Sequence, residues 1–332
     1  MKYFNLSKDK SRQILISVFS IPLLILLVWG ICKYNQKPVL HTTQGFYFDT
    51  VTQISIYDDI SDSEAEDLFA GINKMFADYE NLFSRTKEGS DIYRVNHSDG
   101  NEVSINYETA ALLSYALDIA QKSGGLVDPT IGALSSLWNI GSSGTDSIPT
   151  DTQIKEALST VNYQNVILTQ TSKGYTIRLN NPSSMLDLGF VAKGYIADKA
   201  KEYLLSKNIK SAVINLGGNV LTIGSKPGKD SFNIGIKNPD NTTSTIHTVS
   251  VNDKSVVSSG DYERYIEVDG QRYHHILSTQ TGYPAESDIH QVTIISDSSL
   301  QGDALSTLCF ILGKQKASEY IKSNYPDVEI LF

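Results

Sequence analysis

The stretch QGDALSTLCFILG, residues 301–313, combines a clear helical pattern with three oxygen-bearing side chains on one expected face. Its apolar residues recur at three- and four-residue steps, and Gly313 follows as a stop signal. Asp303, Ser306 and Thr307 are three and four residues apart, so a helix turns their oxygens the same way. Hard oxygen donors suit Mg²⁺ or Ca²⁺ and not a metal that prefers thiolates. The alternative is that Asp303 caps the helix while both hydroxyls bond to carbonyls one turn earlier.

Helical and strand patterns are mixed along the rest of the chain. Helices are expected at 61–84, 107–122, 193–206 and 314–324, and strands at 50–57, 164–169, 175–179, 211–216, 291–296 and 328–332. A β-rich stretch runs from Phe232 to His275, with a hairpin turn at Asp269-Gly270. Because the order does not follow a strict strand–helix–strand period, the predicted fold class is α+β. No linker after residue 45 divides this body into separate domains.

The charge distribution separates a basic N-terminus from an acidic body. The chain has 332 residues and a net charge of −9, yet residues 1–37 hold six basic side chains against one acidic side chain. The remainder therefore carries a net charge of about −14. A body of this sign does not neutralise phosphates in bulk, so no nucleic-acid partner is expected.

An uncharged segment, ILISVFSIPLLILLVWGI at 14–31, is long enough for a short membrane span. Lys8, Lys10 and Arg12 precede it, which favours an N-terminus inside the cell and a body outside. The sequence therefore predicts a protein of the cell membrane with a basic cytoplasmic N-terminus at 1–13, an anchor at 14–32, a linker at 33–45 and an extracytoplasmic body at 46–332. Two alternatives remain, a lipoprotein acylated at Cys32 and a cleaved signal peptide.

A second candidate site lies in LDLGFVAKGYIADKA, residues 186–200. Asp187 precedes a predicted helix start, and Lys193 lies in the first turn of that helix. Helix N-termini offer free N–H groups and a partial positive charge, so this end suits an anion. The Lys193 ammonium would add a point charge for phosphate. The alternative is an N-cap beside a solvated lysine.

Three further segments have glycine or histidine where a ligand could approach. INLGGN, 214–219, ends a buried strand on two glycines, and GGLVDPTIG, 124–132, contains Asp128 in a glycine-flanked loop. RYHHILSTQTGYP, 272–284, ends a strand in paired histidines, and such a residue is an obvious base near neutral pH. Tight turns, and histidines split between the two faces of a sheet, would explain the same residues without a site.

Several well-known catalytic motifs are missing from the sequence. It contains no GxGxxG after a strand, no GxxxxGK[ST], no HExxH, no GxSxG and no paired CxxC. Rossmann dehydrogenases, P-loop enzymes, zincins and the common serine hydrolases are therefore excluded as leading interpretations.

Six segments occur in an order that resembles the ApbE-like FAD:protein FMN transferases: GGLVDPTIGALSSLWNIG, LDLGFVAKGYIAD, INLGGN, SGDYERY, HHILSTQTGYP and DALST. The resemblance covers residues 45–332 and implies a two-lobed, T-fold-like α+β body outside the cytoplasm. It also implies an Mg²⁺-dependent reaction that splits FAD, joins FMN through a phosphoester to a Thr or Ser hydroxyl of an acceptor protein, and releases AMP. The implied acceptor is an exported FMN-binding domain of an electron-transfer protein.

The resemblance also implies roles for individual residues. The metal ligands would be Asp303, Ser306, Thr307 and the backbone carbonyl of Phe190, and the catalytic base would be His275. The positions that match FAD contacts are Phe48, Thr86, Leu126, Val127, Asp128, Asp187, Lys193 and Leu277. Phe48 stands where many members have Met, Thr86 where many have an aromatic residue, and Ser278-Thr279 where many have Asp-Pro.

Two other functions are compatible with these motifs. An FAD pyrophosphatase would use water in place of the acceptor hydroxyl and would yield FMN and AMP. An anchored flavin-binding protein would hold FAD without chemistry, but it would not need the set of Asp303, Thr307 and His275.

Overall fold

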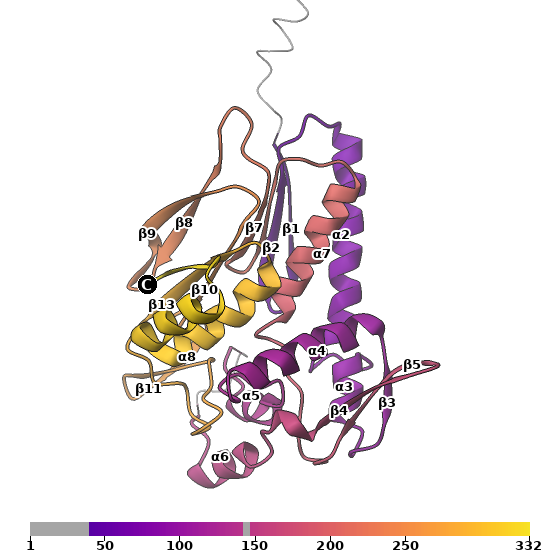
Figure 1. Ribbon diagram of the computed structural model, residues 1–332, viewed down its shortest axis with the longest axis vertical. Coiled ribbons are helices and arrows are strands. Elements are labelled where there is room, and N and C mark those ends of the chain that lie inside the picture. The colour runs from indigo at the N-terminus through magenta and orange to yellow at the C-terminus, as the bar shows by residue number, and fades with distance from the viewer. Residues whose placement is uncertain (1–39, 142–146) are drawn as a thin grey trace, which may run out of the picture. The chain divides into compact units, whose positions relative to one another are not determined.

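The computed structural model describes residues 40–141 and 147–332, and Leu40–Phe332 form one compact unit (Figure 1). The predicted cytoplasmic N-terminus at 1–13, the anchor at 14–32 and the linker as far as residue 39 lie outside the described residues. None of the helices in the described parts has both the length and the apolar character needed to cross a bilayer. The anchor therefore stays a prediction.

A seven-stranded antiparallel sheet forms the framework of this unit. Its strands, in spatial order, are β1 (His41–Tyr47), β2 (Thr50–Ile56), β6 (Ala212–Leu216), β7 (Asn219–Ile223), β10 (Ser255–Gly260), β13 (Gln291–Ser296) and β14 (Glu329–Leu331). Alternating apolar residues build its core face. Ile54, Ile214 and Leu221 are register partners on adjacent strands, and each is at most 1% exposed.

Three helices cover the core: α2 (Asp62–Phe83), α7 (Ala192–Ser206) and α8 (Ser299–Asn324). The apolar stripe predicted for α2 is confirmed, because Leu68, Ile72 and Phe76 are buried. α7 packs on α8, on β6 and on β7, whereas α8 packs on β10 and β13. Burial of each large aliphatic side chain in such a core contributes about 1.5–3 kcal/mol.

A smaller layer lies below the large sheet in Figure 1. It contains α3 (Asp91–Asn96), α4 (Tyr107–Lys122), α5 (Gly132–Trp138), α6 (Asp151–Leu158), the 3₁₀ turn η1 (Tyr163–Asn165), and a sheet of β3 (Val103–Ile105), β5 (Gly174–Leu179) and β4 (Val166–Thr171). Leu134, Trp138, Ile154 and Leu277 form a separate apolar cluster there. The indole N–H of Trp138 donates to the carbonyl of Gly282 at 2.7 Å, which fixes the loop that contains Leu277.

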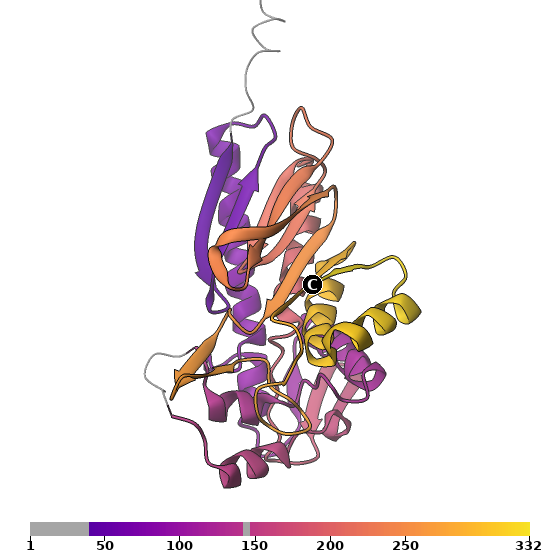
Figure 2. The same ribbon diagram turned by 90° about the vertical axis from the view of Figure 1, so that its left-hand side faces the viewer.

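Two hairpins complete the fold. β8 (Phe232–Asn238) pairs with β9 (Asn241–Val251), and Figure 2 shows this hairpin, in orange, beside the large sheet, where its Ile234 packs with Val256 and Ile295. β11 (Tyr265–Val268) pairs with β12 (Gln271–His274). The second hairpin turns at Asp269-Gly270 as predicted, with φ angles of 52° and 76°. These left-handed values belong to a two-residue type I′ turn.

The predicted α+β class is confirmed, and two boundaries are informative. The backbone of α8 leaves helical geometry at Gly313, with φ of 74°, so the predicted stop is confirmed there. This left-handed φ favours glycine, and a Cβ at this position would also lie 2.4 Å from Oδ1 of Asp288. The linker prediction of 33–45 is wrong at its end, because β1 begins at His41. Residues 41–45 belong to β1, which is ordered by its pairing with β2 across a two-residue turn. Because β1 is an edge strand, its sequence shows little of the apolar alternation by which a strand is predicted.

Candidate active site

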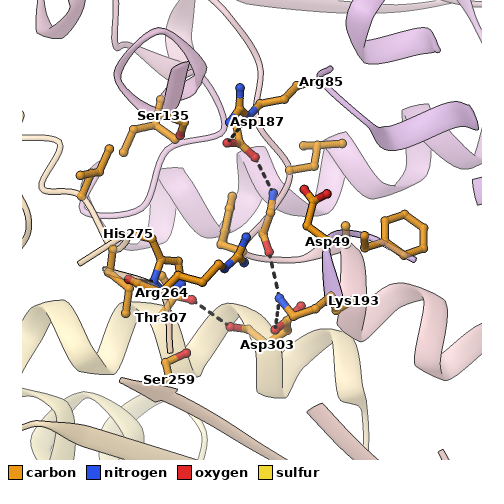
Figure 3. Close-up of a pocket in the computed structure, with 18 of the residues that line it drawn as sticks. Asp49, Arg85, Ser135, Asp187, Lys193, Ser259, Arg264, His275, Asp303 and Thr307 are labelled. Atoms are coloured by element: carbon orange, nitrogen blue, oxygen red, sulfur yellow. Dashed lines mark hydrogen bonds and ion pairs between the residues drawn. The ribbon is translucent and has the colours of Figure 1, made fainter. Parts of the chain in front are cut away.

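One cavity of about 450 Å³ gathers nearly all of the residues that the sequence singled out (Figure 3). Its walls come from the β1–β2 turn, the C-terminal end of α2, the loop before α5, the segment that leads into α7, β10 and α8. Twelve of the thirteen predicted site residues line it: Phe48, Thr86, Leu126, Val127, Asp128, Asp187, Phe190, Lys193, His275, Leu277, Asp303 and Thr307. The thirteenth, Ser306, does not line the cavity.

The carboxylate of Asp303 lies at the junction of α7 and α8. Its Oδ2 accepts a hydrogen bond from the backbone N–H of Gly194 at 2.9 Å, and its Oδ1 lies 3.7 Å from Nζ of Lys193. Burial raises the pKa of Asp303, and the Lys193 charge and the Gly194 N–H oppose that rise. The helices approach this closely because residue 194 is glycine. A Cβ there would lie 2.3 Å from the carbonyl oxygen of Ser299.

Thr307 and Ser306 face different surroundings. Thr307 lines the cavity, and its hydroxyl donates to the backbone carbonyl of Asp303 at 3.4 Å. Ser306 is fully buried, and its hydroxyl accepts from Ser259 of β10 at 2.8 Å and donates to the same carbonyl at 3.0 Å. Along an α-helix, Ser306 is rotated by about 300° and Thr307 by about 400° from Asp303. One hydroxyl therefore lies on each side of the Asp303 direction when the helix is viewed down its axis. The predicted ligand position of Ser306 is therefore not reproduced, because β10 engages its hydroxyl.

The predicted metal ligands that do line the cavity all offer oxygen atoms. Asp303 supplies a carboxylate and Thr307 a hydroxyl, and Phe190, whose carbonyl is the other predicted ligand, lines the same cavity. Within residues 40–141 and 147–332, no three His, Cys, Asp or Glu side chains gather in the manner of a metal site. One carboxylate with neutral oxygens and water is a donor set that suits Mg²⁺.

A backbone carbonyl orients His275. The main-chain N–H and the ring Nδ1 of His275 lie 3.0 and 3.2 Å from the carbonyl oxygen of Arg264. A carbonyl only accepts, so Nδ1 carries the proton and Nε2 keeps a free lone pair. Burial, reinforced by the charges of Arg264 and Lys193, lowers the pKa of His275 to about 3. The ring is therefore neutral at physiological pH, whereas the sequence alone suggests an unperturbed imidazole.

The neighbouring His274 has a structural role. It is 8% exposed, its Nε2 lies 3.1 Å from the carbonyl oxygen of Ala285, and its ring packs edge-on against Phe310. Successive residues at the end of a strand point to opposite sides. One histidine of the pair thus enters the core and the other faces the cavity.

An arginine that the sequence analysis did not single out positions Asp187. Oδ1 of Asp187 accepts from the N–H of Gly189 at 2.8 Å, and Oδ2 lies 3.2 Å from Nε of Arg85. Arg85 also donates to the hydroxyl of Ser136 in α5 at 3.0 Å. These contacts join the end of α2, the segment before α7, and α5 along one wall of the cavity.

Asp128 shapes the opposite loop through its hydrogen bonds. Its oxygens accept from the N–H and hydroxyl of Thr130 at 2.8 and 2.7 Å, and from the N–H of Tyr163 at 2.8 Å. Burial raises the pKa of Asp128, and these hydrogen bonds oppose the rise. The bonded carboxylate fixes the loop from which Leu126 and Val127 reach the cavity.

The β1–β2 turn carries Phe48 and Asp49 to the cavity in a left-handed conformation. Their φ angles are 54° and 56°, which cost non-glycine residues roughly 1–2 kcal/mol each. The N–H of Phe48 donates to Oε1 of Glu80 at 2.9 Å. On the facing turn, a Cβ at Gly217 would lie 2.1 Å from Oγ1 of Thr50. Close packing on both sides therefore maintains the strained turn.

Two charged residues of the SGDYERY segment, Glu263 and Arg264, also line the cavity. The side chain of Glu263 is exposed to the cavity, yet the surrounding protein displaces enough water to raise its pKa to about 7. The charges of Lys193 and Arg264 oppose this rise. In the sequence this segment stood out only as a motif of the family, and no role was predicted for Glu263 or Arg264. Its run of charges directly after a strand was the available signal.

Comparisons with known proteins agree with this arrangement. Residues 48–332 match the sequence profile of the ApbE family. A protein of Treponema pallidum (strain Nichols) named FAD:protein FMN transferase is 34% identical over 319 residues, which is 91% of this chain and 87% of the relative. A protein of the same name from Klebsiella pneumoniae (strain 342) is 36% identical over 272 residues, which is 81% of this chain and 83% of the relative.

The fold leads to the same family. The crystal structure of the ApbE protein from Thermotoga maritima MSB8 is 31% identical, has a TM-score of 0.79, and is matched over 88% of this chain and 94% of that one. The family and the transferase class inferred from six ordered motifs are thereby confirmed. On its sequence, its fold and the composition of its cavity, the chain belongs to the ApbE family.

Proposed function

We propose that this protein transfers FMN from FAD to a Ser or Thr hydroxyl of an acceptor protein, in an Mg²⁺-dependent reaction that releases AMP. The observation that carries the proposal is the shared cavity in which the Asp303–Lys193 pair and the neutral His275 lie together. The names of the relatives support FMN transfer as the type of reaction. The volume of about 450 Å³ is within the usual range for a small-molecule site.

The reaction exchanges one oxygen on phosphorus for another. The acceptor oxygen attacks the phosphorus of the FMN half, and the bond from that phosphorus to the bridging oxygen breaks. AMP leaves with the bridging oxygen and its electron pair, while the hydroxyl proton moves to a base. A hydroxyl is a weak nucleophile until a base takes its proton. Nε2 of His275 is suited to that role, because Nδ1 is already engaged by the Arg264 carbonyl.

Two further roles, phosphate binding and metal binding, are assigned to other residues of the cavity. The Lys193 ammonium, 18% exposed, is able to bind a phosphate oxygen. Asp303 and Thr307, with the carbonyl of Phe190, would hold Mg²⁺. The ion would neutralise phosphate charge when bound.

The acceptor is proposed to be an exported FMN-binding domain of an electron-transfer protein, reached on the outer side of the cell membrane. The basic flank before the uncharged segment 14–31 supports this location. Protease added to intact cells should then remove the body. A mature form that starts at acylated Cys32 would indicate a lipoprotein instead, and a fully protected body would contradict an extracytoplasmic site.

The decisive experiment incubates the full-length protein with FAD, Mg²⁺ and a candidate acceptor domain. Flavin fluorescence on a denaturing gel reports the covalent product, and chromatography reports AMP. Acceptor-bound flavin with an equal amount of AMP is the expected result. FMN and AMP without bound flavin would identify an FAD pyrophosphatase, and intact FAD would identify a binding protein.

A further inference from the structure

In the part of the chain that the structure describes, four cationic side chains line the cavity, and three of them are paired with acids. Arg85 lies 3.2 Å from Asp187, Lys87 lies 3.3 Å from Glu80, and Lys193 lies 3.7 Å from Asp303. Among the residues that the structure describes, the guanidinium of the fourth, Arg264, has neither a hydrogen-bond partner nor an ion-pair partner.

Arg264 occupies a central position among the reactive groups. Its side chain extends from beside His275 toward the middle of the labelled residues (Figure 3). Its backbone carbonyl is the group that orients His275, at 3.0 and 3.2 Å. Its positive charge lowers the pKa of both His275 and Glu263, so the guanidinium is electrostatically close to each. A ligand that reached His275 would therefore also reach this cation.

An unpartnered guanidinium in a half-buried position favours an anionic ligand. Its planar fork matches two oxygens of one phosphate, and such bidentate bonds are stronger than neutral ones. The paired cations of the cavity are each balanced by a carboxylate. No described residue balances the charge of Arg264, so this cation is matched to an anionic ligand.

We propose that Arg264 binds the pyrophosphate of FAD with two N–H groups and stabilises the negative charge that develops as AMP leaves. This inference rests on the proposed function and adds a catalytic residue to it. The acceptor oxygen forms a bond to the FMN phosphorus, and the bond from that phosphorus to the bridging oxygen breaks. AMP takes the electron pair, and the hydroxyl proton goes to Nε2 of His275.

The test compares Arg264→Met, Arg264→Lys and a matched control, Arg272→Met, in the full-length protein. Arg272 does not line the cavity; it lies 3.6 Å from Asp261 and stacks on the ring of Tyr265. FAD and riboflavin affinities are measured by flavin fluorescence, and AMP release is measured with and without the acceptor.

Arg264→Met should keep the melting temperature, because the guanidinium has no partner in the described part of the chain to lose. It should bind FAD about 10-fold more weakly and riboflavin as before, and it should slow AMP release at saturating FAD by about 10²–10³-fold. Arg264→Lys should recover more of the affinity than of the rate, because an ammonium is a point charge. Arg272→Met should match the unmodified protein in FAD affinity, riboflavin affinity and AMP release, because Arg272 does not line the cavity.

Wild-type FAD affinity and AMP release in Arg264→Met would overturn the proposal, as would an equal loss in Arg272→Met. A protein that releases AMP but never labels the acceptor would refute FMN transfer while the Arg264 comparison still holds for FAD cleavage. If no AMP appears at all, the proposed function fails, and unequal FAD and riboflavin affinities in Arg264→Met still decide whether Arg264 binds the pyrophosphate.

Discussion

Nζ of Lys193 lies 3.7 Å from Oδ1 of Asp303, and the two residues come from helices α7 and α8, which are far apart in the sequence. The side chains are 18% and 6% exposed, so water screens the pair less than it screens a surface pair. Removal of one partner leaves the other charge uncompensated. A divalent cation bound to Asp303 would compete with Lys193 and leave the ammonium available to a phosphate.

Asp303→Asn should lower FMN transfer by at least about 10²-fold, since the amide keeps the volume of the side chain but not the charge that holds a cation. The stabilisation of the protein by Mg²⁺, measured by thermal unfolding, should also disappear. Ser306→Ala is the matched control, because Ser306 faces β10 and should leave the Mg²⁺ response unchanged. Full activity of Asp303→Asn at limiting Mg²⁺ would show that the metal lies elsewhere.

Lys193→Met should weaken FAD binding about 10-fold, because its expected partner is a phosphate that is already present in the ground state. Fluorescence titration with FAD gives the comparison. Lys199→Met is the control on the same helix, since Lys199 pairs with Glu202 and lies over the ring of Tyr195 without lining the cavity. Equal affinities of the two variants would remove Lys193 from the phosphate site.

His275→Ala should retain FAD affinity and transfer FMN about 10²–10⁴-fold more slowly, the usual contribution of general base catalysis. Because burial lowers the pKa of His275 to about 3, the ring stays neutral above pH 5, and protonation of His275 should not slow the wild-type reaction near pH 6.5. Rates of AMP release from pH 5 to 8 test this. A variant that loses FAD binding but transfers normally at saturating FAD would make His275 a substrate contact.

The same depressed pKa predicts how stability depends on acid. Unfolded, His275 titrates near 6.5, whereas folded it titrates near 3, so between these values the unfolded chain binds the extra proton. Its contribution to stability is complete above pH 6.5 and is lost as the pH falls toward 3. His275→Gln should therefore lose less stability than the wild type between pH 6.5 and 4 in urea unfolding. If the two proteins lost the same amount of stability over this pH range, His275 would not be a buried neutral imidazole in the folded protein.

Gly194→Ala should destabilise the protein by about 1–3 kcal/mol, because its Cβ would lie 2.3 Å from the Ser299 carbonyl and would push α7 away from α8. Since Gly194 also donates to Asp303, the same change should weaken the Mg²⁺ response. Thermal unfolding with and without Mg²⁺ measures both effects. An unchanged melting temperature would mean that the two helices tolerate a wider separation.

Turns and helix boundaries could be predicted from the sequence where the residues that determine them are neighbours in the chain. The stop at Gly313, the turn at Asp269-Gly270 and the helix of 107–122 follow from rules that act within a few residues, and each is found in the structure. The short helices α3, α5 and α6 were not predicted. Their six to eight residues give too few turns for a periodic signal.

The sequence by itself determined the α+β class, the family and twelve residues that line the cavity, because these depend on local periodicity and on ordered motifs. The tertiary structure alone decided which charges are paired and which are free. Ser306 turns to β10, His275 loses its ordinary pKa, and Arg264 has no partner among residues 40–141 and 147–332. The physical reason is that burial, electrostatic neighbours and hydrogen-bond partners come from segments that only folding brings together.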